Sequence, residues 1–222
     1  MTDSTFCHST PCNIVVLISG SGSNLQAIID DLAGHPTARI CAVVSNRADA
    51  YGLLRAQQAG IATHVLNHKD FVDRLAFDTA LMQVIDQYQA DLVVLAGFMR
   101  ILTPEFTRHY AQRLLNIHPS LLPKYKGLHT HQRAIAAGDQ EHGCSVHFVT
   151  EELDGGPLVI QAVVPISASD DAEQLAQRVH ALEHQIYPLA VRWFAEGRLH
   201  LSQQNAVLDG QPLASSGFQF KS

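Results

Sequence analysis

The chain has 222 residues, of which 46% are hydrophobic and only 16% are charged, so it can form one sizeable core and is too apolar for a disordered chain. Its formal net charge of −6, counted with 13 neutral histidines, gives no basic face for a nucleic-acid backbone and argues against DNA or RNA as a partner. The longest apolar runs fall far short of the roughly 20 residues that a membrane-spanning helix needs, so small-molecule chemistry is favoured and no membrane partner is expected.

The first 12 residues contain no Lys or Arg and lack the apolar stretch of a secretory signal. We expect residues 1–12 to be a poorly ordered extension, residues 13–213 to form a single domain, and residues 214–222 to form a tail. No linker, charge block or repeat divides the chain. The four cysteines show no CxxC spacing and two of them lie in the extension, so no disulfide framework is indicated and the cytoplasm is the favoured compartment.

Short aliphatic and β-branched runs recur along the chain and predict strands. Two of them, Ile14–Ile18 and Leu92–Ala96, are apolar on both faces, as expected when helices cover both sides of a parallel sheet. The other predicted strands are Ile40–Val44, Thr63–Leu66, Leu114–Ile117, Ser145–Val149 and Leu158–Val164.

Helical periodicity appears between these runs, which predicts an alternating order of strands and helices. Such an order is typical of an α/β protein with a Rossmann-like, doubly wound, mostly parallel sheet and helices on both faces. Near the C-terminus, Asp209-Gly210 predicts the turn of a hairpin and an antiparallel edge. The helical apolar positions are Leu25, Ile28, Ile29 and Leu32, a similar spacing within Phe71–Tyr88, and Leu175, Val179, Leu182 and Ile186.

A glycine turn, Ser19-Gly-Ser-Gly22-Ser23-Asn24, connects the first predicted strand to the first predicted helix. Free N–H groups and a partial positive charge at a helix N-terminus can hold a phosphate, and Ser23 or Asn24 could cap that helix. The dinucleotide fingerprint is incomplete because Leu25 stands where a third glycine is needed, and no Walker lysine follows. A monophosphate is therefore favoured over NAD or ATP, although such glycines can also serve only a tight turn.

A polar set that could perform chemistry follows two later strands. Asn116 and His118 are two residues apart and lie on one face if the short strand extends through them. An Asn amide can donate to a developing oxyanion, a His can donate a proton near neutral pH, and a carboxylate such as Asp154 favours the imidazolium. Any one of the three alone could equally close a strand or form a turn, so their combination carries the interpretation.

The segment from Asn116 to Pro123, Asn-Ile-His-Pro-Ser-Leu-Leu-Pro, resembles the signature of the 10-formyltetrahydrofolate-dependent formyltransferases. Further segments match, in order, the pattern of those family members that formylate phosphoribosylglycinamide, and the resemblance runs from about residue 13 to residue 213. These segments are Ser19–Asn24, Ala96–Leu102, Gly127–Thr130 and Leu153–Pro157.

The resemblance implies a transferase of purine (IMP) biosynthesis with the formyltransferase fold. It would move a formyl group from its co-substrate, 10-formyltetrahydrofolate, to the amino group of N1-(5-phosphoribosyl)glycinamide. The amine would attack directly through a tetrahedral intermediate, without a metal. The implied partners are these two small molecules, with no nucleic acid and no membrane. The protein itself would be a monomer or a homodimer.

The resemblance also implies roles for particular residues. Asn116, His118 and Asp154 would be the catalytic residues. The implied ligands of the phosphorylated substrate are Gly22, Ser23, Asn24 and Glu183. The implied folate-binding residues are Arg74, Met99, Arg100, Ile101, Leu102, Asn116, Thr150, Glu151, Glu152, Leu153 and Asp154.

Other functions compete with this one. A methionyl-tRNA formyltransferase or a formyltetrahydrofolate hydrolase would share the chemistry, but each usually carries a further domain. A non-catalytic domain that binds a phosphorylated metabolite would need only the glycine turn. A metal enzyme is suggested by His129-Thr-His131, although the sequence has no HExxH pattern.

Overall fold

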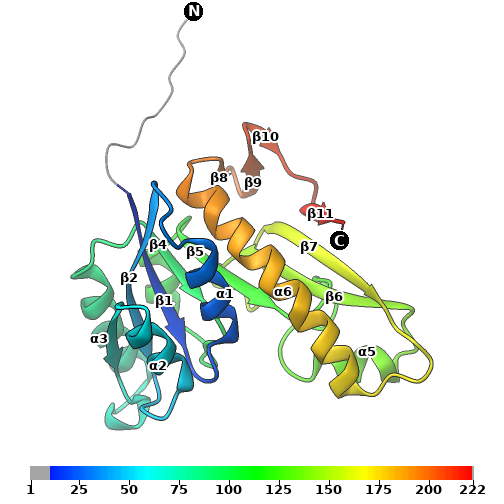
Figure 1. Ribbon diagram of the computed structural model, residues 1–222, viewed down its shortest axis with the longest axis horizontal. Coiled ribbons are helices and arrows are strands. Elements are labelled where there is room, and N and C mark those ends of the chain that lie inside the picture. The colour runs from blue at the N-terminus through cyan, green and yellow to red at the C-terminus, as the bar shows by residue number, and fades with distance from the viewer. Residues whose placement is uncertain (1–10, 222) are drawn as a thin grey trace, which may run out of the picture.

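A mostly parallel sheet of eight strands runs through the centre of the molecule (Figure 1). The computed structural model describes residues 11–221, so the expected N-terminal extension lies outside the described residues except for its last two, and Cys12 already begins the first strand. The strand order is β11-β7-β6-β5-β4-β1-β2-β3. The strands are β1 (Cys12–Ile18), β2 (Ala38–Ser45), β3 (Ala62–Val65), β4 (Leu92–Leu95), β5 (Leu114–His118), β6 (Glu141–Phe148), β7 (Leu158–Pro165) and β11 (Phe218–Phe220).

Neighbouring strands of this sheet are parallel except at β6, which runs antiparallel to both β5 and β7. Every run that the sequence predicts as a strand forms one, and the predicted mostly parallel α/β class is confirmed. Runs that are apolar on both faces form the central strands because helices bury both of their faces.

Helices cover the sheet on both sides, and β1 shows how one strand serves both cores. Ile14, Val16 and Ile18 pack with residues of α1, α2 and α6, whereas Val15 and Leu17 pack with residues of α3 and α4. Within residues 11–221, no helix combines the length and the apolar character needed to cross a membrane. The helices are α1 (Ser23–Asp31), α2 (Tyr51–Gln58), α3 (Arg74–Asp86), α4 (Pro104–His109), α5 (Thr130–Ala136), α6 (Ala172–Ala195) and the short 3₁₀ helix η1 (His68–Asp70).

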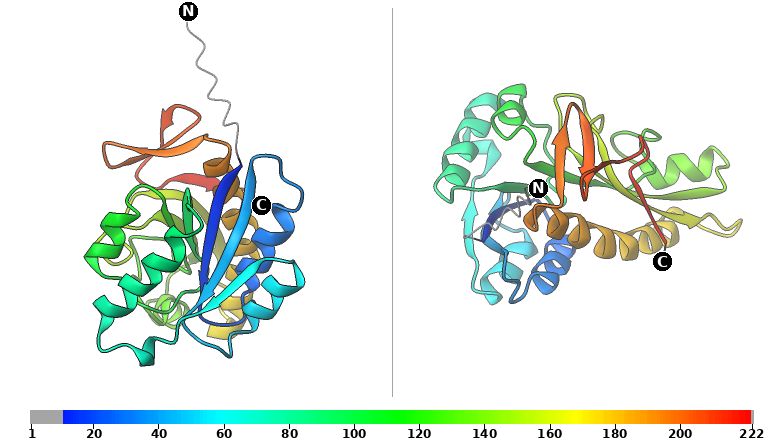
Figure 2. Two further views of the ribbon diagram at one scale, coloured as in Figure 1. Left: turned by 90° about the vertical axis from the view of Figure 1, so that its left-hand side faces the viewer. Right: turned by 90° about the horizontal axis from the view of Figure 1, so that it is seen from above.

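The C-terminal segment differs from the predicted edge and tail. Strands β8 (Leu199–Ser202), β9 (Asn205–Leu208) and β10 (Gln211–Pro212) form a separate antiparallel sheet beside the end of α6 (Figure 2). The predicted hairpin turn is confirmed, with left-handed φ values of 50° at Asp209 and 76° at Gly210.

The last residues are not a tail after residue 213, because β11 pairs in parallel with β7 and extends the main sheet. The ring of Phe218 also meets the Trp193 ring edge to face, with centroids 5.4 Å apart. Because both contacts join this segment to the core, the interpretation of residues 214–222 as a tail is wrong for the part that forms β11.

A buried tyrosine of α6 joins this helix to two central strands. The Tyr187 hydroxyl lies 3.0 Å from the carbonyl oxygens of both Leu95 in β4 and Leu115 in β5. Burial raises the pKa of Tyr187 well above its ordinary value, so the hydroxyl remains a donor shared between the two carbonyls. This contact fixes the distance between α6 and the strands β4 and β5, whose carboxyl ends are followed by candidate site residues.

We expect Tyr187→Phe to lower the free energy of unfolding by about 1–2 kcal/mol, because it leaves buried carbonyls without their shared donor. Urea unfolding followed by circular dichroism measures the change. Tyr51→Phe is the matched control, since Tyr51 is 54% exposed and its replacement should leave the free energy of unfolding nearly unchanged. Equal stability of the two variants would contradict the role assigned to Tyr187.

Candidate active site

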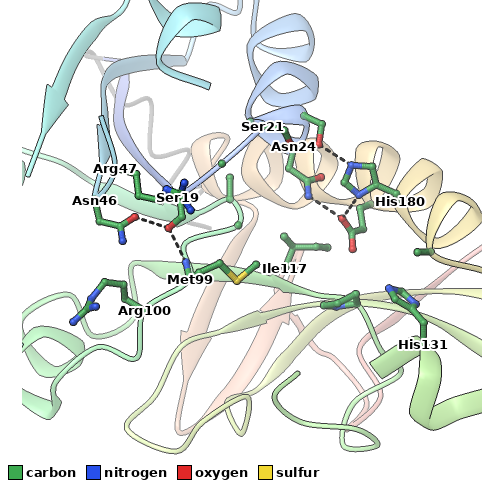
Figure 3. A pocket seen from close by; sticks show the side chains of 18 of the residues that line it. Ser19, Ser21, Asn24, Asn46, Arg47, Met99, Arg100, Ile117, His131 and His180 are labelled. Atoms are coloured by element: carbon green, nitrogen blue, oxygen red, sulfur yellow. Dashed lines mark hydrogen bonds and ion pairs between the residues drawn. The ribbon is translucent and has the colours of Figure 1, made fainter. Parts of the chain in front are cut away.

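A cavity of about 690 Å³ opens where the carboxyl ends of β1, β4 and β5 meet α6 (Figure 3). The chain leaves β1 toward β2 on one side, while β4 and β5 continue the sheet on the other, so the cavity occupies a topological switch point. Its lining includes the glycine turn after β1, the segment after β4, the end of β5 and one face of α6. Loops that separate at such a point leave room for a ligand.

The glycine turn forms the entrance to α1. Gly22 is the N-cap residue, with a left-handed φ of 69°, and a Cβ at this position would stand 2.5 Å from the Cα of Gly52. Among the described residues no side chain caps the helix, so the expectation that Ser23 or Asn24 would do so is wrong. Because both side chains turn toward α6 instead, the first N–H groups of α1 are left for an anion at the cavity.

Ser23 and Asn24 meet a polar pair on α6. The Asn24 amide donates to Glu183 Oε2 over 2.8 Å, and the Ser23 hydroxyl lies 2.7 Å from His180 Nε2. His180 Nδ1 in turn lies 2.9 Å from the same Glu183 Oε2. Glu183 is only 6% exposed, so these contacts hold a buried carboxylate at the cavity wall.

His180 is a site residue that the sequence reasoning missed. It lies three residues before Glu183, so the helical repeat places both on one face of α6. The three-residue spacing between His180 and Glu183 was the feature of the sequence that could have identified His180. A lone helical histidine gives no sign of its partner, and Ser23 is 157 positions away in the sequence.

A second set of hydrogen bonds joins the turn after β1 to the turn after β4 (Figure 3). The Ser19 hydroxyl donates to Asn46 Oδ1 over 2.6 Å and accepts from the Met99 N–H over 2.8 Å. The Ser19 N–H also donates to the Gly97 carbonyl over 3.1 Å. The two halves of the cavity therefore share one buried hydroxyl, and a shift of either turn would break it.

Asn116, His118 and Asp154 come together at the end of β5. Asn116 and His118 both belong to this strand, and Asp154 approaches from the loop between β6 and β7. His118 Nδ1 lies 3.5 Å from Asp154 Oδ2, and the Gly127 N–H donates to that oxygen over 2.9 Å. The His118 and Asp154 side chains are 8% and 9% exposed, so their interaction is little weakened by solvent. His118 Nε2 donates to the Tyr125 carbonyl over 2.9 Å, which fixes the ring.

A further histidine, His147, fixes the Asn116 amide and was also missed. His147 Nδ1 lies 2.9 Å from the Phe148 carbonyl, which can only accept, so Nδ1 carries the proton. Burial lowers the pKa of His147, and in the neutral ring Nε2 accepts from the Asn116 amide 3.1 Å away. The second amide hydrogen of Asn116 remains for another acceptor.

The position of His147 depends on strand pairing. It stands opposite Asn116 in the antiparallel ladder of β5 and β6, and the register between β6 and β7 shifts between Val146 and His147. Such an irregularity redirects a side chain within a strand. The sequence places His147 in a predicted strand but does not specify which residue it faces.

A small pocket of about 130 Å³ adjoins Asn116 and collects most of the predicted folate-binding residues. Leu95 and Phe98 contribute apolar wall, and His147 also lines it. Met99 instead lines the large cavity, and Arg74 is exposed at the first turn of α3 and lines neither cavity. The predicted residues in the pocket lining are Arg100, Ile101, Leu102, Asn116, Thr150, Glu151, Glu152, Leu153 and Asp154.

The His129-Thr-His131 segment suggested a metal enzyme, but His131 contacts another histidine. His131 Nδ1 lies 3.1 Å from Nε2 of the buried His142. Burial lowers the pKa of His131, and burial together with the neighbouring His131 lowers the pKa of His142 to about 4. Within residues 11–221, no group of three or more His, Cys, Asp or Glu side chains is arranged to hold a metal ion.

Known proteins resemble this chain in sequence and in fold. The sequence model of the formyl transferase family matches residues 12–191. The phosphoribosylglycinamide formyltransferase of Escherichia coli K12 is 59% identical over 207 residues, which are 93% of this chain and 98% of that protein. The solved structure of the phosphoribosylglycinamide formyltransferase of Coxiella burnetii, in complex with CHES, is 56% identical with a TM-score of 0.91 and covers 95% of this chain and 100% of its own. These similarities confirm the family that the motifs predict.

His142 should make the stability of the fold depend on pH. Its pKa is about 4 in the folded chain and about 6.5 when unfolded, so between these values the unfolded chain binds more protons. The free energy of unfolding should therefore fall as the pH drops through this window, by up to about 1.4 kcal/mol per pH unit from this residue.

Urea unfolding at several pH values measures this dependence. His142→Gln should reduce the slope, and His200→Gln, at an exposed position, should retain the wild-type slope. A wild-type slope in His142→Gln would show that His142 is not the group responsible.

Proposed function

The chain belongs to the formyl transferase family, and from this we propose that it transfers a formyl group from 10-formyltetrahydrofolate to the amino group of phosphoribosylglycinamide, a step of purine biosynthesis. The observation that carries the proposal is the meeting of two unlike cavities at one polar strand end. The large cavity has a helix N-terminus without a side-chain cap and a buried carboxylate, and the small pocket combines apolar side chains with polar and charged ones. Asn116 lines the small pocket and its neighbour Ile117 lines the large cavity.

The large cavity matches the chemistry of the phosphorylated substrate. The N-terminus of α1, with Gly22, Ser23 and Asn24, offers donors to a phosphate. Glu183, held through Oε2 by Asn24 and His180, offers its carboxylate to the glycinamide end. The Glu183 carboxylate adjoins the helix terminus through Asn24, so one cavity offers donors for a phosphate and an acceptor for the amino end of the same ligand.

The small pocket suits the flat ring system of the folate. Residues from Arg100 to Leu102 and from Thr150 to Asp154 line it, together with Leu95 and Phe98. Exposed apolar side chains stand near its mouth, with Ile101 57% and Leu153 50% exposed. This combination of apolar side chains and hydrogen-bonding groups suits a flat, partly polar ligand.

Chemistry is assigned to the point where the two cavities meet. The amine attacks the formyl carbon, a C–N bond forms, and the bond from that carbon to N10 of the folate breaks. The free amide hydrogen of Asn116 donates to the oxyanion of the tetrahedral intermediate, and His118 beside Asp154 supplies positive charge. The amine loses a proton and N10 gains one, and we assign this transfer to the His118–Asp154 pair.

The proposal extends to partners and compartment. The two small molecules are the proposed partners, and the net charge of −6 supports the exclusion of nucleic acid. Within residues 11–221, Cys12, Cys41 and Cys144 are free thiols, which supports the cytoplasm as the compartment.

Transfer of labelled formyl from 10-formyltetrahydrofolate to phosphoribosylglycinamide by the purified chain tests the proposed function. Product should form only when both substrates are present. Formate released without phosphoribosylglycinamide would instead indicate a hydrolase, and absence of any turnover would leave a binding domain.

Asn116→Ala should lower kcat by about 10² to 10³, because removal of one oxyanion donor costs about 2.7–4 kcal/mol of transition-state stabilisation. Steady-state kinetics with both substrates measures the loss, and circular dichroism checks the fold. Asn205→Ala changes an exposed asparagine of β9 and serves as the matched control. Near-normal turnover in Asn116→Ala would remove Asn116 from the mechanism.

A further inference from the structure

A line of three polar side chains crosses from α6 to the phosphate end of the large cavity. Glu183 Oε2 lies 2.9 Å from His180 Nδ1, and His180 Nε2 lies 2.7 Å from the Ser23 hydroxyl. Figure 3 shows His180 on α6 beside the first turn of α1, at the wall of the cavity. Ser23 therefore stands between a titratable ring and the place assigned to the phosphate.

The protons on this line follow from what each group can do. A carboxylate only accepts, so His180 Nδ1 carries a hydrogen in either charge state of the ring. When the ring is neutral, Nε2 has a lone pair and the Ser23 hydroxyl must donate to it. Ser23 then presents only lone pairs to the cavity. When the ring is protonated, Nε2 donates to Ser23, and the hydroxyl hydrogen is released toward the cavity.

We infer that His180 is a positioning residue whose protonation turns the Ser23 hydroxyl into a donor to the substrate phosphate, and so couples binding of the phosphorylated substrate to uptake of a proton. This inference rests on the proposed function, because it assigns the phosphate to the N-terminus of α1. It concerns regulation of the same site by pH and leaves the chemical step untouched.

The arginines that line the large cavity do not supply the positive charge that a protonated His180 would add. Among residues 11–221, its lining includes Arg47 and Arg100 and contains no lysine. Arg47 is paired with Asp49, with 2.6 Å between Nη2 and the carboxylate. Arg100 follows β4 at the border with the small pocket, which it also lines. An imidazolium at His180 would therefore add positive charge beside the anion site.

The groups that face His180 distinguish it from the neighbouring histidines, because its pKa is raised and theirs are lowered. On its own helix, Glu183 accepts from it and raises its pKa, and the ring of His184 packs at 4.4 Å between centroids. Burial lowers the pKa of His184 and of His131, which faces the cavity from α5, so both rings stay neutral. The contact from α1 is Ser23, which does not titrate in this range.

Two further charged groups lie near the cavity. Arg55 of α2 acts on His184 and donates to the Ser21 carbonyl over 2.9 Å. Glu173, in the first turn of α6, adds a carboxylate to the cavity lining. The phosphate itself would favour the imidazolium further, so binding should draw a proton onto His180.

The linkage between proton binding and substrate binding determines how the substrate affinity changes with pH. Because the complex holds the proton more tightly than the free enzyme, substrate affinity falls as the pH rises past the pKa of His180 in the free enzyme. The KM for phosphoribosylglycinamide should rise by up to about tenfold per pH unit until the pKa of the complex is reached. The KM for 10-formyltetrahydrofolate should not follow this course.

The test compares the pH dependence of KM for phosphoribosylglycinamide in the wild type, His180→Gln and His200→Gln. The glutamine amide in His180→Gln can donate to Ser23 at every pH, so this variant should lose the part of the dependence that His180 contributes. His200→Gln, at an exposed position, should keep the wild-type dependence. The substrate's own ionisations are the same for all three proteins and cancel in the comparison. A wild-type pH dependence in His180→Gln would overturn the inference.

Calorimetry provides a readout that does not depend on turnover. Titration with inorganic phosphate in two buffers of different ionisation enthalpy gives the number of protons taken up on binding. Wild type should take up more protons than His180→Gln, and equal uptake would overturn the inference. Absence of formyl transfer in the wild type would instead defeat the proposed function, so the two failures are distinguishable.

Discussion

The site depends on the close spacing of three parallel strand ends, those of β1, β4 and β5. Apolar side chains on both faces of these strands are buried beneath helices, which leaves only their carboxyl ends for polar residues. Tyr187 joins β4 and β5 to α6 from inside the core, and Ser19 joins the turns after β1 and β4 at the rim. Groups from distant parts of the chain are therefore held in fixed relation before any ligand arrives.

Two buried carboxylates, Glu183 and Asp154, lie in the proposed site. Glu183 receives hydrogen bonds from Asn24 and His180, and Asp154 receives one from the Gly127 backbone. A buried charge is tolerated only with such donors, so each carboxylate also dictates how its neighbours point. The same contacts that stabilise these charges therefore orient the side chains that would meet the substrate.

Histidines in this molecule differ in charge because their surroundings differ. Burial keeps His147 and His142 neutral, and a neutral His147 accepts from an amide as its geometry requires. His180 lies at the rim of a cavity beside a carboxylate, so the imidazolium is favoured there. One residue type thus serves as a fixed acceptor in the core and as a titrating donor at the rim.

The sequence by itself determined the strands, the main helices and the α/β class, because hydrophobic period is a local property. The roles of Asn116, His118 and Asp154 are predicted from short motifs, which are local as well. It did not determine that Phe218–Phe220 completes the main sheet or that Ser23 and Asn24 turn away from capping α1. The sequence also did not reveal the roles of His147 and His180, since each acquires its role from a partner on another element. Only tertiary structure sets strand register and helix placement, and these depend on packing energies summed over the whole core.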